Sequence, residues 1–177
     1  MKVIILAGGA GTRLGRMSQE TPKPMVMIGD RPIIWHIMKI YSHYGFRDFI
    51  ISLGYKQHCI KEYFYNYNIH ANDFNINLGT KKIDILNFHE ESEWNVSLVN
   101  TGLNTLKGAR IKRLENLLDD NLNMVTYGDG VADIDINALI KFHKEHGRML
   151  TITGVRPPSR FGEIIEKGNV ALSFKEK

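Results

Sequence analysis

The residues of this chain best suited to chemistry are a glycine-rich stretch and the arginine that follows it. Residues 6–14 have the sequence LAGGAGTRL, in which Gly8, Gly9 and Gly11 lie close together and Arg13 comes just after them. Glycines leave the backbone N–H groups of a loop free to converge on a phosphate. A guanidinium presents a planar fork of donors that suits phosphate oxygens. The spacing therefore predicts a phosphate-binding loop.

Two common phosphate-binding motifs do not account for this loop. A dinucleotide-binding fingerprint needs a third glycine, but Thr12, Arg13 and Leu14 follow Gly11. A P-loop needs Gly-Lys followed by Ser or Thr, and this tripeptide occurs nowhere in the chain. The remaining pattern is GGxGTRL followed by PKPM at residues 22–25. A glycine-rich turn without a ligand is the alternative interpretation.

Two further side chains are suited to the same phosphates. Lys23 lies between two prolines, which stiffen the backbone around its ammonium group. Asp129 lies between two glycines directly after an apolar run, where it can approach a metal ion. A carboxylate beside phosphate oxygens is the usual way to hold Mg²⁺. The alternatives are a solvated loop lysine and a turn aspartate bonded to its own backbone.

The elements that must position these residues follow an alternating pattern. An apolar run predicts a central strand at residues 2–6, and a helix follows with Asp30 as its N-cap, Pro32 in its first turn and Gly45 as its stop. A second buried strand at 49–53 and a helix through 60–64 come next. This order demands a right-handed crossover and a parallel sheet.

The second half of the chain predicts further elements of both kinds. Ligands of such open sheets bind outside the carboxyl ends of the strands, so we expect the glycine loop and Asp129 at one edge. We place loops at 101–102 and 107–108. Helices are predicted at 111–118 and 136–146, and strands at 74–78, 82–88, 96–99, 124–127 and 150–155, with a hairpin formed by 164–166 and 170–174.

Composition limits the class of protein. The 177 residues suit one domain, or one domain with part of another, and 43% apolar and 24% charged residues are ordinary for a soluble globule. The net charge of +4 is scattered, which by itself fits a small phosphorylated substrate as well as a nucleic acid. We expect a small phosphorylated substrate and no nucleic acid as partner. A single cysteine, Cys59, fits a reducing compartment. Without a long apolar run or signal peptide, we expect no membrane partner and a cytoplasmic location.

The motifs resemble a known enzyme family. LAGGAGTRL with PKPM is similar to the signature of the sugar-1-phosphate nucleotidylyltransferases. The segments IWHIMK at 34–39, WNVSLVNTG at 94–102, TYGDGVAD at 126–133 and RFG at 160–162 resemble the glucose-1-phosphate cytidylyltransferase branch. The resemblance implies a Rossmann-like three-layer α/β/α nucleotidyltransferase fold with a mixed, mostly parallel sheet. It also implies the reaction of CTP with glucose 1-phosphate to give CDP-glucose and diphosphate, with Mg²⁺ as cofactor.

The resemblance also assigns roles to individual residues. Arg13 and Lys23 would be catalytic and Asp129 would hold the metal, while Leu103 and Asn104 depart from the pattern that the family leads us to expect in the nucleotide-binding loop. The implied nucleotide-binding residues are Leu6, Ala7, Gly8, Gly9, Ala10, Gly11, Thr12, Arg13, Lys23, Thr105, Arg110 and Gly128.

The resemblance extends over residues 1–177 but covers only part of what the family contains. The family continues with a sugar-binding segment and a second metal-binding aspartate, so we expect these residues to be the nucleotide-binding portion of the domain without its sugar-binding portion. The full-length protein is expected to be a homo-oligomer. Two alternatives stay open: a related transferase that uses dTTP or UTP, and a non-catalytic module that binds a nucleotide.

Overall fold

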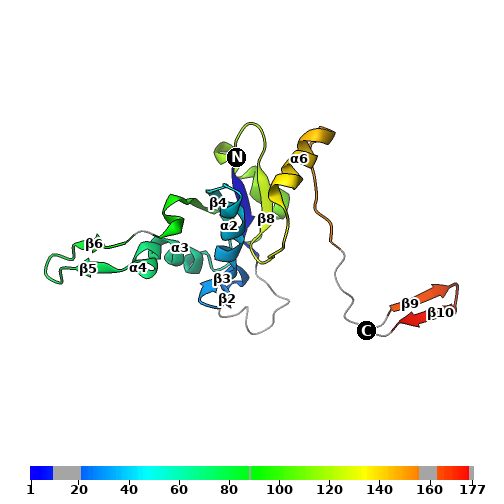
Figure 1. Cartoon of the computed structure of the whole chain (residues 1–177), viewed down its shortest axis with the longest axis horizontal. Coiled ribbons are helices and arrows are strands. Elements are labelled where there is room, and N and C mark those ends of the chain that lie inside the picture. Colours follow the sequence, from blue (N-terminus) through cyan, green and yellow to red (C-terminus); the bar gives the residue numbers. More distant parts are fainter. Residues whose placement is uncertain (10–20, 88, 156–162, 176–177) are drawn as a thin grey trace. The chain divides into compact units, whose positions relative to one another are not determined.

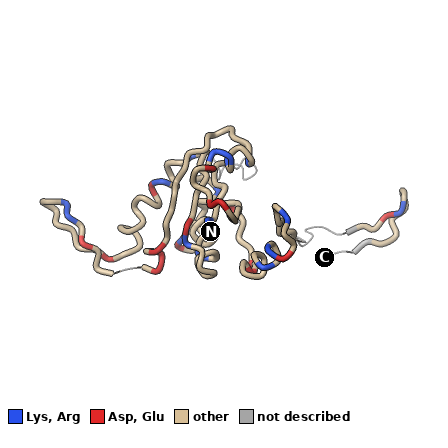
Figure 2. The backbone as a smooth tube through the Cα atoms, turned by 90° about the horizontal axis from the view of Figure 1, so that it is seen from above, with Lys and Arg blue, Asp and Glu red and all other residues tan. Residues whose placement is uncertain are grey.

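A computed structural model describes residues 1–9, 21–87, 89–155 and 163–175 (Figure 1). The chain divides into two compact units, Met1–Asn137 and Ala138–Lys177. Charged residues of both signs alternate along the backbone of the described segments (Figure 2). None of the helices in the described ranges is long and apolar enough to cross a lipid bilayer.

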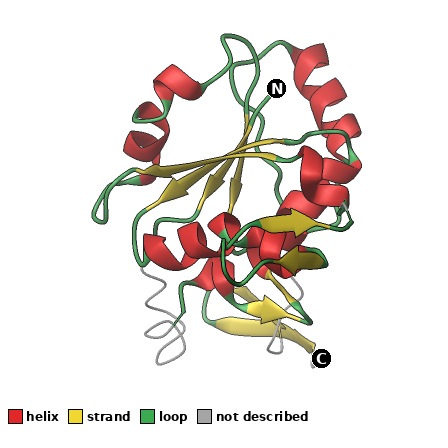
Figure 3. Cartoon of the chain, turned by 90° about the vertical axis from the view of Figure 1, so that its left-hand side faces the viewer, coloured by secondary structure: helices red, strands yellow, loops and turns green. Residues whose placement is uncertain are grey.

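The first unit is built on a four-stranded parallel sheet. Its strands are β1 (Val3–Leu6), β4 (Asp48–Leu53), β7 (Asn95–Asn100) and β8 (Met124–Tyr127), in the order β7-β4-β1-β8. Figure 3 shows these strands as arrows that point the same way. Leu6 is in register with Ser52 on one side and with Tyr127 on the other. The loops that follow the four strands therefore meet at one edge.

Helices pack on both faces of this sheet, as the predicted three-layer fold requires. Helix α2 (Ile33–His43) and helix α3 (Gln57–Tyr65) place Ile34, Ile37, Met38 and Ile60 against Val3, Ile5 and Ile51. The opposite face carries Ile4 and Ile50, and Leu114 covers them between helix α5 (Lys107–Lys112) and the 3-10 turn η4 (Glu115–Leu117). Successive residues of β1 thus point to opposite faces, as strand geometry demands.

The remaining elements of the first unit are short. They are the 3-10 turns η2 (Lys23–Met25) and η3 (Glu90–Glu93), the antiparallel pairs β2 (Met27–Ile28) with β3 (Arg31–Pro32) and β5 (Phe74–Ile76) with β6 (Ile83–Ile85), and helix α4 (Tyr67–Ala71). The second unit contains most of helix α6 (Ile136–His146) and the antiparallel hairpin of β9 (Glu163–Lys167) and β10 (Val170–Lys175). These pairings confirm the predicted hairpin, whose turn contains Gly168 at φ +62°.

The predicted start of the first helix was wrong. Asp30 does not cap α2, because it lies with Gly29 in the turn that joins β2 to β3. Gly29 has a φ of +65°, which a tight hairpin turn needs and a glycine adopts at little cost. The carboxylate of Asp30 lies 3.8 Å from Arg31 Nε, and α2 begins after Pro32 without a side-chain cap. The predicted stop was right, since Gly45 follows the helix at φ +87°.

Two other predicted elements differ from the structure. Residues 107–108 are not a loop, because α5 begins at Lys107, and the predicted helix 111–118 is the end of α5 followed by η4. Residues 150–155 do not form a strand, and Leu150 and Ile152 are exposed at 71% and 80%. A strand needs a hydrogen-bonded neighbour, and in the described part of the second unit β9 and β10 pair only with each other.

Candidate functional site

A cavity of about 450 Å³ lies at the carboxyl ends of the strands and contains the predicted site residues that the structure describes. Leu6 and Tyr127 are the last residues of β1 and β8, and other lining residues follow within a few positions of a strand end. Ala10, Gly11, Thr12 and Arg13 lie outside the described residues. The predicted residues that line the cavity are Leu6, Ala7, Gly8, Gly9, Lys23, Thr105, Arg110, Gly128 and Asp129.

The described part of the glycine loop is held tightly at its start and is open at Gly9. Ala7 N donates to Ser52 O at 2.9 Å, and Tyr55 N donates to Gly8 O at 3.1 Å. A Cβ on Gly8 would lie 2.0 Å from Nη1 of Arg110, so no larger residue fits there without displacing that guanidinium. A Cβ on Gly9 would meet no atom of the described residues within 4 Å. Gly9 therefore presents bare backbone toward open space, as a ligand-binding loop requires.

Gly128 is a glycine because three groups crowd it. Its N–H donates to Leu6 O at 3.0 Å, which ties the end of β8 to the end of β1. A Cβ there would lie 3.1 Å from Pro24 Cγ and 3.3 Å from Ala7 Cβ. This close packing brings Asp129, the next residue, beside the segment that carries Lys23.

Lys23 and Asp129 form an ion pair inside the cavity. Lys23 Nζ lies 3.6 Å from Asp129 Oδ2, and the two side chains are 21% and 42% exposed. Lys23 begins η2, with Pro22 as the N-cap and Pro24 buried, so the backbone under the ammonium group is fixed. Sequence reasoning placed each residue separately, and the structure brings them together from segments about 100 positions apart.

Arg110 lines the cavity and forms hydrogen bonds to residues at the ends of three strands. Its side chain donates to Leu53 O at 3.1 Å, to Thr101 Oγ1 at 2.8 Å and to Gly8 O at 3.1 Å. A fourth bond reaches Leu103 O at 3.0 Å. The residue is 5% exposed, and burial, with a smaller contribution from the charge of Arg113, lowers its pKa. A guanidinium remains charged under such a shift, so Arg110 places a positive charge under the glycine loop.

The segment that carries Thr105 is fixed by a second arginine. Arg113 Nη1 donates to Thr101 O at 2.5 Å and to Thr105 Oγ1 at 2.8 Å. Thr101 itself is fully buried and shares a hydrogen bond of 2.8 Å with Ser52. Thr105 therefore has a defined position at the cavity wall, although the sequence around it departs from the family pattern.

Sequence reasoning missed two lining residues that contact each other. Lys107 Nζ lies 5.2 Å from the centre of the Tyr127 ring, within the range of a cation–π interaction. Tyr127 ends β8 directly before Gly128, so its position at the site followed from the predicted strand. No motif or strand end in the sequence marks Lys107 as a site residue. It reaches the site because the chain after β7 crosses the edge of the sheet.

The donors of this cavity fit Mg²⁺. Among the described residues that line it, Asp129 supplies the one carboxylate. Among the described residues, no three His, Cys, Asp or Glu side chains gather closely enough to hold a metal ion by themselves. Mg²⁺ in proteins usually combines one or two carboxylates with substrate phosphates and water. A single aspartate beside a phosphate-binding loop is such a donor set.

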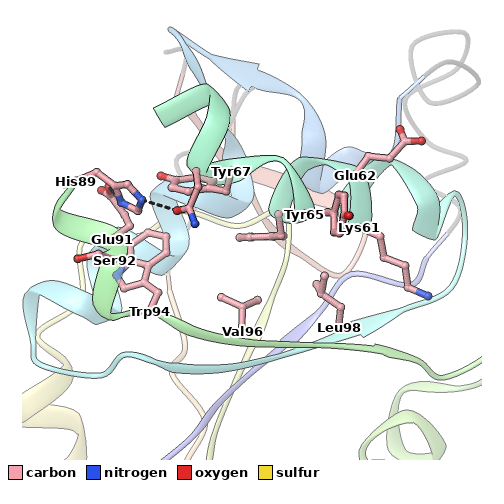
Figure 4. Close-up of a pocket in the computed structure, with 12 residues that line it drawn as sticks. Lys61, Glu62, Tyr65, Tyr67, His89, Glu91, Ser92, Trp94, Val96 and Leu98 are labelled. Atoms are coloured by element: carbon pink, nitrogen blue, oxygen red, sulfur yellow. Dashed lines mark hydrogen bonds and ion pairs between the residues drawn. The ribbon is translucent and has the colours of Figure 1, made fainter. Parts of the chain in front are cut away.

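A second cavity, of about 650 Å³, lies between α3, α4, η3 and β7 (Figure 4). Trp94, Val96 and Leu98 form one side along the start of β7, and aromatic residues such as Tyr67 stand opposite (Figure 4). The cavity contains none of the predicted site residues.

Three polar groups of this second cavity, those of Glu91, His89 and Asn68, are bonded in a chain that also includes Lys39. Glu91 pairs with Lys39 at 2.9 Å and with His89 at 3.3 Å, and His89 Nε2 lies 3.1 Å from Asn68 Oδ1. Burial alone would raise the pKa of Glu91, but the hydrogen bond from Lys39 and the neighbouring charges bring it below its usual value. We therefore take the cavity at the strand ends as the candidate site.

Comparisons with known proteins agree with this geometry. Residues 2–177 match the nucleotidyl transferase family. The chain is 49% identical to the glucose-1-phosphate cytidylyltransferase of Salmonella typhimurium and 40% identical to the probable glucose-1-phosphate cytidylyltransferase of Bacillus subtilis. Each comparison covers 100% of this chain and 69% of the relative.

A solved structure shows the same architecture. The crystal structure of HddC from Yersinia pseudotuberculosis complexed with GMP-PN superposes with a TM-score of 0.64 at 25% identity, covering 99% of this chain and 69% of HddC. The parallel sheet, the flanking helices and the match over nearly all residues agree with the predicted fold class. This chain therefore belongs to the nucleotidyl transferase family.

Proposed function

We propose that this chain forms the CTP-binding part of a glucose-1-phosphate cytidylyltransferase. In the reaction, a phosphate oxygen of α-D-glucose 1-phosphate attacks the α-phosphorus of CTP. A new P–O bond forms, the bond to the β-phosphate breaks, and CDP-glucose and diphosphate result. The names of the relatives from Salmonella typhimurium and Bacillus subtilis support this choice of substrates.

One observation carries the proposal more than any other. Lys23, Asp129 and the open backbone at Gly9 line one cavity at the carboxyl ends of the strands. A cation, a carboxylate and a glycine loop in one place are the groups that a nucleoside triphosphate with a divalent cation requires. The second cavity has charged residues such as Lys61 and Glu62 beside its aromatic and apolar surface, but no glycine is among its described lining residues.

Both substrates are anions, so the protein must overcome their repulsion. Positioning and charge neutralisation supply nearly all of the catalysis in reactions of this class. In our proposal, the backbone of residues 6–10 lines the nucleotide, and Gly11, Thr12 and Arg13 bind its triphosphate. Lys23 stabilises charge near the α-phosphate, and no general base is needed because the attacking phosphate is already ionised.

The other assigned residues hold the nucleotide in place. Thr105 and Gly128 line the cavity wall, and Arg110 adds positive charge beneath Gly8. Asp129 would hold Mg²⁺, which when bound would screen the phosphate charges and stabilise the departing diphosphate. With its carboxylate engaged by the ion, Asp129 would no longer neutralise Lys23, whose ammonium group would then be available to the phosphates.

The test is a panel of nucleotides. The complete enzyme is incubated with glucose 1-phosphate, Mg²⁺ and one of CTP, UTP, dTTP, GTP or ATP, and products are separated by anion-exchange chromatography. We expect CDP-glucose to form fastest, by at least tenfold over the other nucleotide sugars. Faster formation of UDP-glucose or dTDP-glucose would replace the cytidylyl assignment. Tight CTP binding without any product would favour a non-catalytic nucleotide-binding module.

A further inference from the structure

The segment from Thr101 to Arg113 crosses the whole carboxyl edge of the sheet. It leaves β7, the strand at one edge, and Arg110 contacts Leu53 at the end of β4 and Gly8 just after β1. Lys107 then reaches Tyr127 at the end of β8, the strand at the other edge. This one segment thus starts at or contacts the ends of all four strands. Its contact with Tyr127 lies two residues from Asp129 in the sequence.

Lys107 differs from the other lysines near the site in what holds its charge. Lys23 pairs with Asp129, and Lys112, five residues further along, pairs with Glu115 at 2.6 Å. Lys107 lies over the Tyr127 ring, and within the described ranges it has no carboxylate partner. A cation–π contact orients an ammonium group without neutralising it. The three donors of Lys107 therefore remain available to an anion.

The charges of the cavity also favour an anion at this position. In the described part of the lining, Lys23, Lys107 and Arg110 occur together with a single carboxylate, that of Asp129. The described side chains of the lining therefore carry a net positive charge, which suits the several negative charges of a nucleoside triphosphate. Lys107 would add its charge to those that the proposed function already assigns to the phosphate chain.

We propose that Lys107 is a further phosphate-binding residue of this site and that Tyr127 positions its ammonium group. The inference rests on the proposed function in taking the ligand to be a nucleoside triphosphate. It does not depend on which base the nucleotide carries, because the interaction is with the phosphate chain.

The experiment measures binding by isothermal titration calorimetry in the presence of Mg²⁺. The ligands are CTP, CMP and inorganic tripolyphosphate, and the variants are Lys107→Met, Lys107→Arg and Tyr127→Leu. Lys112→Met is the matched control, because Lys112 lies on the same helix and is exposed, with its charge held by Glu115. Circular dichroism verifies that each variant is folded.

We expect Lys107→Met to weaken the binding of CTP and tripolyphosphate about tenfold, the size of effect that a charge-assisted contact provides, and to change CMP binding less than twofold. Tyr127→Leu should weaken triphosphate binding by a smaller factor, and Lys107→Arg should restore most of it. The inference is overturned if Lys107→Met binds tripolyphosphate within twofold of wild type, or if CMP loses as much affinity as CTP. A wild-type protein that prefers another nucleotide would contradict the proposed function and leave the tripolyphosphate comparison valid.

Discussion

The cavity at the strand ends and the cavity beside β7 are similar in size but differ in how their charges are used. Beside β7, Glu91 is bonded to Lys39 and His89, and the lining combines apolar and aromatic side chains with polar ones such as Lys61 and Asn68. At the strand ends, Arg110 and Lys107 have no carboxylate partner among the residues described, and Gly9 leaves the backbone open. Charges paired within the protein stabilise the fold, whereas charges left unpaired beside an open loop are available to a ligand.

The largest expected effect follows from removing the cation that pairs with Asp129. Lys23→Ala should lower turnover of CTP and glucose 1-phosphate on the order of 10²–10³-fold, or about 3–4 kcal/mol, because the charge near the α-phosphate is lost. Steady-state kinetics measures this, and an unchanged melting temperature within about 2 °C shows that the fold is intact. Kinetics like those of the wild type would remove the assigned role of Lys23.

The assignment of Asp129 to Mg²⁺ predicts a smaller effect, on the Mg²⁺ dependence of CTP affinity. Asp129→Asn should abolish the dependence of CTP affinity on Mg²⁺, because the carboxylate that would hold the ion is gone. Calorimetric titrations with and without Mg²⁺ should differ about tenfold in the wild type and less than twofold in the variant. If the variant responds to Mg²⁺ as strongly as the wild type, the ion is held elsewhere.

Substituting Gly8 and Gly9 compares the stability contributions of the tightly packed and the open position of the glycine loop. Gly8→Ala should lower the free energy of unfolding by about 1–3 kcal/mol, since the added Cβ would lie 2.0 Å from the Arg110 guanidinium and would displace its hydrogen bonds. Gly9→Ala is the matched control for stability, because no atom of the residues that the structure describes lies within 4 Å of its added Cβ. Urea unfolding measures the free energy of unfolding of both variants. An equal decrease in the two variants would show that the hydrogen bonds of Arg110 do not contribute to stability.

The smallest expected effect lies in the second cavity. Glu91→Gln should lower the free energy of unfolding at pH 7 by about 1 kcal/mol and leave CTP affinity unchanged. The pKa of Glu91 is lowered in the folded protein, so its contribution is present above the unfolded pKa and is lost as the pH falls through the folded pKa.

The difference between wild type and variant should therefore shrink below about pH 4.5, the ordinary pKa of the group. Thermal melts between pH 3 and pH 7 measure it. Glu90→Gln is the control, since Glu90 also pairs with Lys39 but its side chain is 84% exposed. A loss for Glu91→Gln that persists at the lowest pH would have a cause other than the charge.

The positions of site residues could be predicted from the sequence where a local motif and the order of the strands indicated the same place. The glycine loop, Lys23 and Asp129 each stand in a short motif, and the rule that ligands bind at strand ends placed the glycine loop and Asp129 at one edge. Arg113 and Lys107 have no such motif, because their positions depend on how residues 101–113 cross the sheet. The predicted helix cap at Asp30 was wrong because Asp30 lies beside Gly29 in the β2–β3 turn. The predicted strand at 150–155 was wrong because these residues pair with no described strand. Helix caps and strands both depend on neighbouring segments, which a local sequence pattern does not contain.

The central claim is that CTP binds at the strand ends and not beside β7. Hydrogen–deuterium exchange with and without CTP and Mg²⁺ tests this directly, because bound ligand slows exchange of the amides that it covers. We predict protection in peptides that contain residues 6–9, 103–107 and 127–129, and none in those that contain 61–68 and 89–98. Protection confined to residues 61–68 and 89–98 would contradict the account.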